Sequence, residues 1–162
     1  AGGGLFQEQA ARYEIVDQVP GGNAGAYGTV FQARDLQNNE LVAVKRANSV
    51  SDPNDINDQG VPVTVLREAA LLKHLQHPNV LELKDIYVHD NHFHFVVELC
   101  SCNLRHYIME VGDAGERWVA EPHLKNLMRQ ILAGVAFCHN RRILHRDLIP
   151  DNILLDAVRG VW

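Results

Sequence analysis

Alternating apolar and polar residues recur through the first hundred positions of the chain, in short runs separated by glycine- and asparagine-rich turns. Runs of this kind, rich in β-branched and aromatic residues, indicate strands with a buried face. The predicted strands span residues 13–19, 28–35, 40–47, 80–88 and 92–100. The first two form a candidate hairpin, and the last two form an antiparallel pair turned at 89–91. We therefore expect one five-stranded antiparallel sheet.

Three other segments carry apolar residues at helical spacing. The predicted helices span residues 62–76, 102–111 and 121–140. A proline suits the first helical turn at Pro62, and "HPN" at 77–79 ends that helix. The longest helix carries an apolar stripe that consists of Leu124, Leu127, Met128, Ile131, Leu132 and Val135. A stripe of this kind needs a partner surface, so the pattern as a whole predicts an α+β fold.

Composition narrows the class of protein. The chain has 162 residues, of which 46% are hydrophobic, so it predicts a globular domain with a core of its own. A net charge of −5 provides no basic field for nucleic acid. No apolar run reaches the length that crosses a bilayer, and the start lacks the apolar stretch of a signal peptide. We expect a disordered start over residues 1–12, no membrane or nucleic-acid partner, and an intracellular location with three free cysteines.

The glycine-bearing turn between the first two strands is a candidate phosphate-binding loop. Closely spaced glycines let main-chain N–H groups approach phosphates, because no Cβ stands in the way. Gly25, Gly28 and Val30 fit the spacing G-x-G-x-x-G-x-V, whereas Asn23 occupies the place of the first glycine. Taken alone, such a hairpin is more often an ordinary turn.

A lysine at the end of the third strand strengthens the phosphate hypothesis. Lys45 ends "VAVK", and the valines on both sides of Ala43 predict that this strand is buried. A lysine in that position needs an anionic partner or an exit to solvent. Glu68, on the following predicted helix, is the natural partner. The alternative is a surface ion pair, worth about 0–1 kcal/mol and silent on function.

The segment after the longest helix carries the most specific pattern. Its residues His145, Arg146, Asp147, Leu148, Pro150 and Asn152 match H-R-D-L-x-P-x-N. This pattern resembles the catalytic loop of protein kinases. "PVTVLRE" (62–68), "GAYGTVFQARD" and "LLKHLQHPNV" are similar to the cyclin-dependent kinases in particular. The resemblance covers roughly residues 12 to 162.

The resemblance implies a protein-kinase-like fold. Residues 13–100 would form a complete N-lobe, with the five-stranded sheet and a C-helix, and 101–162 the hinge and part of the C-lobe with its first helices and catalytic loop. The sequence stops before an Asp-Phe-Gly motif, so the resemblance implies a fragment of one kinase domain. The implied activity is ATP-dependent phosphoryl transfer to serine or threonine of a protein substrate, with Mg²⁺. A cyclin-like partner would bind residues 62–68, in the nucleus or the cytoplasm.

The family's roles carry over residue by residue. Lys45 would hold the α- and β-phosphates and Glu68 would hold Lys45. Asp147 would orient the substrate hydroxyl and accept its proton, and Asn152 would ligate Mg²⁺. The ATP-binding residues implied by the resemblance are Gly25, Gly28, Val30, Ala43, Lys45, Glu98, Cys100, Asn103 and Leu154. Val97 would stand behind the adenine, in a pocket roomier than the usual phenylalanine allows.

Several positions depart from the family pattern. Tyr27 stands where the family carries an inhibitory phosphotyrosine, but its usual threonine neighbour is Ala26. Ile149 replaces the lysine that faces the transferred phosphate, and loss of that cation would cost on the order of 3 kcal/mol, or about a hundredfold in rate. With the Asp-Phe-Gly segment also missing, we expect these 162 residues to be inactive and, because the stripe from Leu124 to Val135 would be exposed, poorly soluble.

Two rival interpretations stay open. A pseudokinase-like module would bind a nucleotide or a cyclin without catalysis, and Ile149 favours it. A metal site could combine Cys100 and Cys102 with nearby histidines, the candidates being His89, His92, His94 and His106. Its one-residue cysteine spacing is poor for tetrahedral zinc. His145 is expected to be a hydrogen-bonded scaffold residue, because Asp147 already performs the acid–base role.

Overall fold

A computed structural model describes residues 11–19, 29–47, 72–73, 75–90, 92–113 and 121–156 of the chain. The chain divides into two compact units. The first unit comprises residues 1–75 and 82–99, and the second comprises 76–81 and 100–162. The segment 76–81 therefore belongs with the second unit, although strands of the first unit flank it in the sequence.

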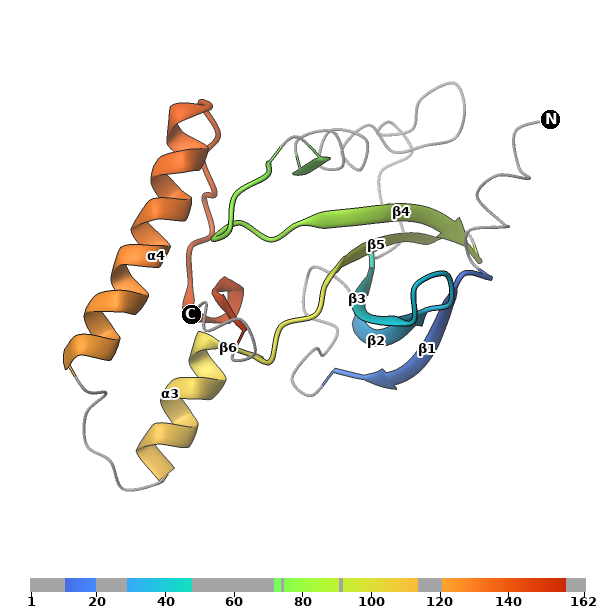
Figure 1. Cartoon of the computed structure of the whole chain (residues 1–162), viewed down its shortest axis with the longest axis horizontal. Helices are drawn as coiled ribbons and strands as arrows, with labels where there is room; N and C mark the ends of the chain where they lie inside the picture. Colours follow the sequence, from blue (N-terminus) through green and yellow to red (C-terminus); the bar gives the residue numbers. More distant parts are fainter. Residues whose placement is uncertain are drawn as a thin grey trace. The chain divides into compact units, whose positions relative to one another are not determined.

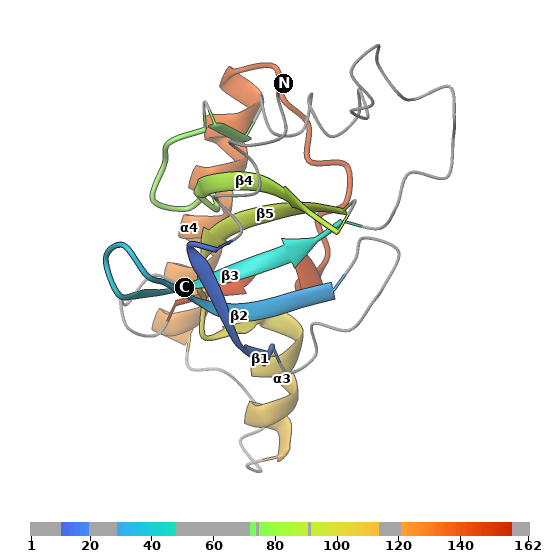
Figure 2. The ribbon, with the colours of Figure 1, turned by 90° about the vertical axis from the view of Figure 1, so that its right-hand side faces the viewer.

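The first unit contains one antiparallel sheet. Its strands are β1 (Tyr13–Gln18), β2 (Thr29–Asp35), β3 (Glu40–Arg46), β4 (Leu83–His89) and β5 (His92–Glu98). The spatial order is β1-β2-β3-β5-β4, and Figure 2 shows the strands side by side in this order. All neighbouring strands pair antiparallel, with irregular register after Ile15 in β1 and after Leu83 in β4. The five-stranded antiparallel sheet predicted from the alternation is confirmed.

The turns between strands follow the local sequence. The β2–β3 turn at residues 36–39 ends in Asn39 with φ 62°, and the β4–β5 turn contains Asp90 with φ 47°. Asn and Asp accept this left-handed conformation more readily than other non-glycine residues. The predicted turns at both places are therefore explained by residues that tolerate positive φ.

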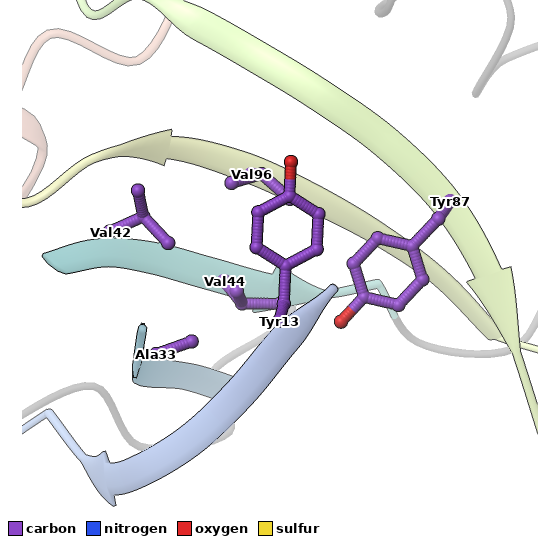
Figure 3. Close-up of a cluster of buried hydrophobic side chains, with 6 residues drawn as sticks. All are labelled: Tyr13, Ala33, Val42, Val44, Tyr87 and Val96. Carbon is purple, nitrogen blue, oxygen red and sulfur yellow. The ribbon is translucent and has the colours of Figure 1, made fainter. Parts of the chain in front are cut away.

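The core of the first unit lies on one face of the sheet. Figure 3 shows this core cluster, which consists of Tyr13, Ala33, Val42, Val44, Tyr87 and Val96. Register puts these side chains together, because Ala33 pairs with Val42 and Val44 pairs with Val96. The Tyr13 and Tyr87 rings stack with centroids 5.5 Å apart. Alternation places every second residue of β3 on this face, and the others point to the opposite face.

Hydrogen bonds and ion pairs between charged side chains lie beside Tyr13 of this core cluster. Arg12 donates from Nε to Asp35 Oδ1 at 2.8 Å, and the Tyr13 hydroxyl donates to Asp85 Oδ2 at 2.8 Å. Asp35 is buried, and the Arg12 guanidinium is the main reason why the pKa of its carboxyl lies below the usual value. Burial, followed by the hydrogen bond to Asp85, raises the pKa of Tyr13. Arg12 thus ties β1 to β2 at the point where the sheet begins.

The second unit contains two helices and a small two-stranded sheet. The helices are α3 (Leu104–Asp113) and α4 (Glu121–Asn140), and both predicted helices in this part of the chain are confirmed. Strands β6 (Cys102–Asn103) and β7 (Leu154–Leu155) pair antiparallel, and a short 3-10 helix, η2 (Pro150–Asn152), precedes β7. Figure 1 shows β6 leading directly into α3. The small sheet was not predicted, because two-residue strands carry no periodicity.

Helix α4 packs against the segment 77–79. Asn79 Nδ2 donates to Gln130 Oε1 at 2.9 Å, and the rings of His77 and Phe137 lie 4.7 Å apart. Between them Gly134 is buried, so close to Asn79 that a Cβ there would meet the Asn79 carbonyl oxygen at 2.4 Å. The residues "HPN", predicted only as a helix stop, therefore form the surface that α4 packs on.

The apolar stripe of α4 is not one continuous exposed patch, as the sequence had suggested. Leu127 is buried with 4% of its surface exposed, and Ile131 and Val135 are partly covered. Leu124, Met128 and Leu132 form the exposed row, at 46%, 45% and 60%. The stripe therefore consists of two rows at i, i+4 spacing, of which the row Leu127, Ile131 and Val135 is the less exposed.

The first predicted helix, over 62–76, lies almost wholly outside the described residues, as do the loop 48–60 and the glycine-bearing turn. Only the pair 72–73 of that segment is described as helical. No helix in the described part of the chain is long and apolar enough to span a membrane.

Candidate active site

A left-handed turn at the end of α4 starts the loop that carries the His-Arg-Asp residues. Arg142 N–H donates to the His139 carbonyl at 2.8 Å, and Ile143 N–H donates to the Cys138 carbonyl at 3.0 Å. Together with φ 61° at Arg142, this is a Schellman motif, which satisfies carbonyls that the helix end would leave unpaired. The position usually holds glycine. The turn sends the chain back along the second unit as an extended segment.

Asp147 and Asn152 lie directly against each other. The Asn152 amide nitrogen Nδ2 donates to the Asp147 carboxylate Oδ2 at 2.8 Å and to the Asp147 main-chain oxygen at 2.9 Å. Both amide protons are thereby directed to Asp147, which fixes the plane of the amide and the direction of its carbonyl oxygen. The 3-10 turn Pro150–Asn152 makes this contact possible over only five residues. The two residues predicted from the pattern are thus brought together.

The residues before Asp147 act as a scaffold. Asp147 N–H donates to His145 Nδ1 at 3.3 Å, which is the hydrogen-bonded role expected for this histidine. Arg146 between them has φ 64°. A non-glycine residue in the left-handed region costs on the order of 1 kcal/mol, and such strain tends to gather at functional sites. The backbone is bent here so that the Asp147 carboxylate meets Asn152.

Ile149 occupies the extended position just before the 3-10 turn. Its φ and ψ are −120° and 161°, and 41% of its surface is exposed. Its neighbour Leu148 is also exposed, at 50%. An exposed aliphatic side chain two residues from Asp147 offers neither a charge nor a proton donor. Ile149, which stands where the family carries a lysine, is therefore exposed on the loop and is not buried in a core.

Strand register in the first unit gathers the predicted nucleotide-binding residues on one face of the sheet. Val30 pairs with Lys45, and Ala43 pairs with Val97. Because paired residues and every second residue share a face, all four side chains lie on the face opposite the core cluster. Ala43 is 7% exposed and Lys45 is partly buried. The sequence roles assigned to β2, β3 and β5 are thus consistent with one surface.

The remaining ATP-binding predictions fall on the segment 98–103 and on β7. The Glu98 carboxylate accepts a hydrogen bond from Glu82 N–H at 3.1 Å. Asn103 caps α3, since its Oδ1 accepts from His106 N–H at 2.8 Å. Leu154, 41% exposed, stands opposite Asn103 in the β6–β7 pair. Asn103 and Leu154 are therefore neighbours, although 51 positions separate them in the sequence.

The cysteines of this region are free thiols. Burial is the main reason why the pKa of the Cys102 thiol is raised, with a smaller contribution from the Glu110 charge. Burial therefore disfavours the thiolate form through which a cysteine binds a metal. Among the described residues, no group of three histidine, cysteine or acidic side chains is placed to hold a metal ion. The rival hypothesis of a zinc site built on Cys100 and Cys102 finds no support in this part of the chain.

Several predicted site residues lie outside the described residues. These are Gly25, Gly28, Tyr27 with Ala26, Asn23, Glu68 and the remainder of 62–68. Their assigned roles stay predictions. Lys45 and Val30 belong to the first unit, and Asp147 and Asn152 belong to the second.

Two site residues were missed by sequence reasoning. Asp151 lies between Pro150 and Asn152, and its carboxylate accepts from Arg105 Nε at 2.8 and 2.7 Å. Neither residue belongs to the His-Arg-Asp pattern as it was used, and 46 positions separate them. The only available signal was the place of Asp151 inside the matched loop.

In the first unit, Lys45 shares a sheet face with Val30, Ala43 and Val97, and in the second unit Asn152 is hydrogen-bonded to Asp147. Residues 21–161 match the protein kinase domain family, and the chain belongs to this family. The prediction of a protein-kinase-like fold is thereby confirmed.

A cyclin-dependent kinase is among the relatives. Cyclin-dependent kinase 1 of Encephalitozoon cuniculi (strain GB-M1) is 37% identical to this chain over 137 residues. The alignment covers 85% of the chain and 44% of that protein. The similarity supports the resemblance to cyclin-dependent kinases inferred from the sequence, and the chain spans less than half the length of this relative.

Proposed function

We propose that the chain is part of an ATP-dependent serine/threonine protein kinase of the cyclin-dependent type. The observation that carries the proposal is the double hydrogen bond from the Asn152 amide to Asp147. It leaves the amide carbonyl oxygen directed as a ligand atom and holds the carboxylate of Asp147 in a fixed place. Both are what phosphoryl transfer asks of a protein, which contributes chiefly position and charge.

The donor atoms of this loop suit Mg²⁺. Magnesium prefers oxygen ligands, and the Asn152 amide supplies one. When bound with ATP, Mg²⁺ neutralises charge on the phosphates. Asp147 orients the substrate hydroxyl and accepts its proton as a general base. His145 supports the Asp147 main chain from the other side.

The face of the sheet opposite the core cluster would receive the nucleotide. Val30, Ala43 and Val97 supply an apolar surface for the base, and Lys45 supplies a cation for the phosphates. Alanine in β3 suits this role because its small side chain lets a flat ring approach the strand. The roles of the glycine loop and Glu68 belong to the same proposal and rest on the sequence resemblance.

We propose that these 162 residues alone do not catalyse phosphate transfer. Ile149 supplies no cation beside the transferred phosphate, which costs on the order of 3 kcal/mol in the transition state. The name of the relative, cyclin-dependent kinase 1, supports a cyclin-like partner, which would bind residues 62–68. A protein substrate and a nuclear or cytoplasmic location belong to the same proposal.

The alternative function is a pseudokinase-like module that binds nucleotide or cyclin without catalysis. Ile149 favours it, because an isoleucine supplies neither a charge nor a proton donor to a transferred phosphate. The two functions differ in whether the Asp147 carboxylate ever receives a proton from a substrate.

Nucleotide binding and phosphate transfer are measured together to test the proposal. At a hundredfold excess of Mg·ATP over its dissociation constant, the melting temperature should rise by about 5–10 °C. Lys45→Met should remove most of this rise, whereas Asp147→Asn should keep it. Ile149→Lys restores a cation beside the transferred phosphate, and transfer to a protein substrate is measured in this variant. A melting temperature that is insensitive to Mg·ATP would contradict the kinase and a nucleotide-binding module alike, and measurable transfer by Ile149→Lys would contradict the module.

A further inference from the structure

The segment after β5 and the loop that carries Asp147 run antiparallel through a short series of contacts in the second unit. Ser101 N–H donates to the Leu155 carbonyl at 2.8 Å, and Leu104 N–H donates to the Ile153 carbonyl at 2.8 Å. Between these two bonds lies the β6–β7 pair. We call the contacts between 101–105 and 151–155 the ladder. Its main-chain bonds stop at Ile153, one residue short of Asn152.

The Arg105–Asp151 ion pair continues the ladder past Asn152. Arg105 Nε donates to both Asp151 oxygens, at 2.8 and 2.7 Å. Asn152 therefore lies between the last main-chain bond of the ladder and this side-chain bond. Pro150 at the start of η2 offers no N–H to fix that turn from the other end. In Figure 1 the red turn η2 lies next to the beginning of α3.

The charges at the start of α3 explain why the pair forms. Helix α3 has no acidic residue in its first turn, where negative charge is favoured by the helix dipole. It carries the cation Arg105 there instead. Asp151 supplies the missing negative charge from outside the helix and neutralises Arg105. The Asn103 cap at the same end satisfies an N–H group but brings no charge.

We propose that Arg105 and Asp151 are positioning residues, which hold the Asn152 amide against Asp147 by fixing η2 to the first turn of α3. The inference deepens the proposed function, because Asn152 is the ligand residue assigned there. It concerns the geometry of this chain's own loop, however, and it can be tested without nucleotide.

The side-chain amide of Asn152 reports directly on the proposal. Its two protons give a resolvable pair of signals in an ¹⁵N-correlated NMR spectrum of the full chain, identified by their loss in Asn152→Asp. In Arg105→Ala and in Asp151→Ala, exchange of these protons with water should speed up by about three- to fivefold, the range that an exposed ion pair can supply. Arg105→Lys should give an intermediate rate, because lysine keeps the charge but loses the guanidinium geometry.

Two further variants keep the test decisive. The exchanged pair Arg105→Asp with Asp151→Arg should return the Asn152 signals toward the unmodified rate. Glu110→Gln breaks the neighbouring exposed pair between His106 and Glu110 on the same helix and should leave the Asn152 signals unchanged. Unchanged exchange in both Arg105→Ala and Asp151→Ala, or an equal effect of Glu110→Gln, overturns the proposal. Failure of the proposed function would be seen in a different measurement: the melting temperature would not change with Mg·ATP, while the exchange rates of the Asn152 amide would still differ between the variants.

Discussion

Replacing Gly134 by alanine is expected to destabilise the second unit, although alanine is the better helix former. In the middle of a helix, alanine should be favoured over glycine by about 1 kcal/mol. At Gly134, however, the added Cβ would lie 2.4 Å from the main-chain oxygen of Asn79. Ordinary C···O contacts lie at roughly 3.3 Å or more, so the segment 77–79 has to retreat by about 0.9 Å.

The cost of this retreat can be estimated from the neighbouring contacts. Overpacking of a buried site costs about 1–3 kcal/mol. A shift of Asn79 also stretches its 2.9 Å bond to the buried Gln130, and a weakened bond of this kind costs about 1–2 kcal/mol. After the gain in helix propensity is subtracted, we expect Gly134→Ala to lower the free energy of unfolding by about 1–4 kcal/mol.

Urea unfolding followed by the helical circular-dichroism signal measures this change. Ala133→Gly and Ala136→Gly, at exposed positions of the same helix, are the matched controls, and each should cost about 1 kcal/mol from propensity alone. The clashing atom belongs to the main chain, so adding Asn79→Ala should not rescue Gly134→Ala. A Gly134→Ala chain as stable as the unmodified protein, or more stable, would refute the reasoning.

Three further predictions concern stability. Arg12→Met should cost about 2–3 kcal/mol by removing charge-assisted hydrogen bonds to the buried Asp35. Since the pKa of Asp35 is lowered in the folded chain, this difference should be fully present above the usual aspartate value of 3.8. It should be lost only as the pH falls further, through the lower pKa of the folded chain, which urea midpoints across pH would show. Burial lowers the pKa of His94 in the folded chain, so the unfolded chain takes up a proton first as the pH falls, and the free energy of unfolding should decrease below pH 6.5. His94→Phe should flatten this dependence on pH. An unchanged slope in this variant would exclude His94 as the source. Arg142→Gly should raise the free energy of unfolding by about 0.5–1 kcal/mol, because glycine adopts φ 61° without strain, and a loss of stability would contradict the assigned turn.

The sequence predicted those parts of the fold that repeat along the chain. Alternation located the five strands, and helical spacing located α4 with its bounds, Glu121 and Asn140. It could not predict the strand order β1-β2-β3-β5-β4, because pairing depends on long-range packing rather than on period. The spacing of apolar residues in α4 also predicted one stripe where the structure has two rows of different exposure. A helical pattern shows which residues share a side of the helix but not what covers them.

The candidate site, too, was predicted from the sequence only in part. The His-Arg-Asp pattern predicted Asp147 and Asn152 because five positions separate them and the intervening turn is short. Arg105 and Asp151 were missed because their contact is set by β6 and β7, whose two residues each carry no periodic signal. The packing role of Asn79 was missed because "HPN" is equally explained as a helix stop.

The main-chain part of the ladder has a consequence for sequence variation. Bonds from Ser101 and Leu104 N–H to carbonyls of β7 and Ile153 do not depend on which side chains these residues carry. Only proline, which lacks the N–H group, is incompatible with a donor position. The backbone bonds that flank Asn152 therefore tolerate a change of side chain at every donor position except a change to proline.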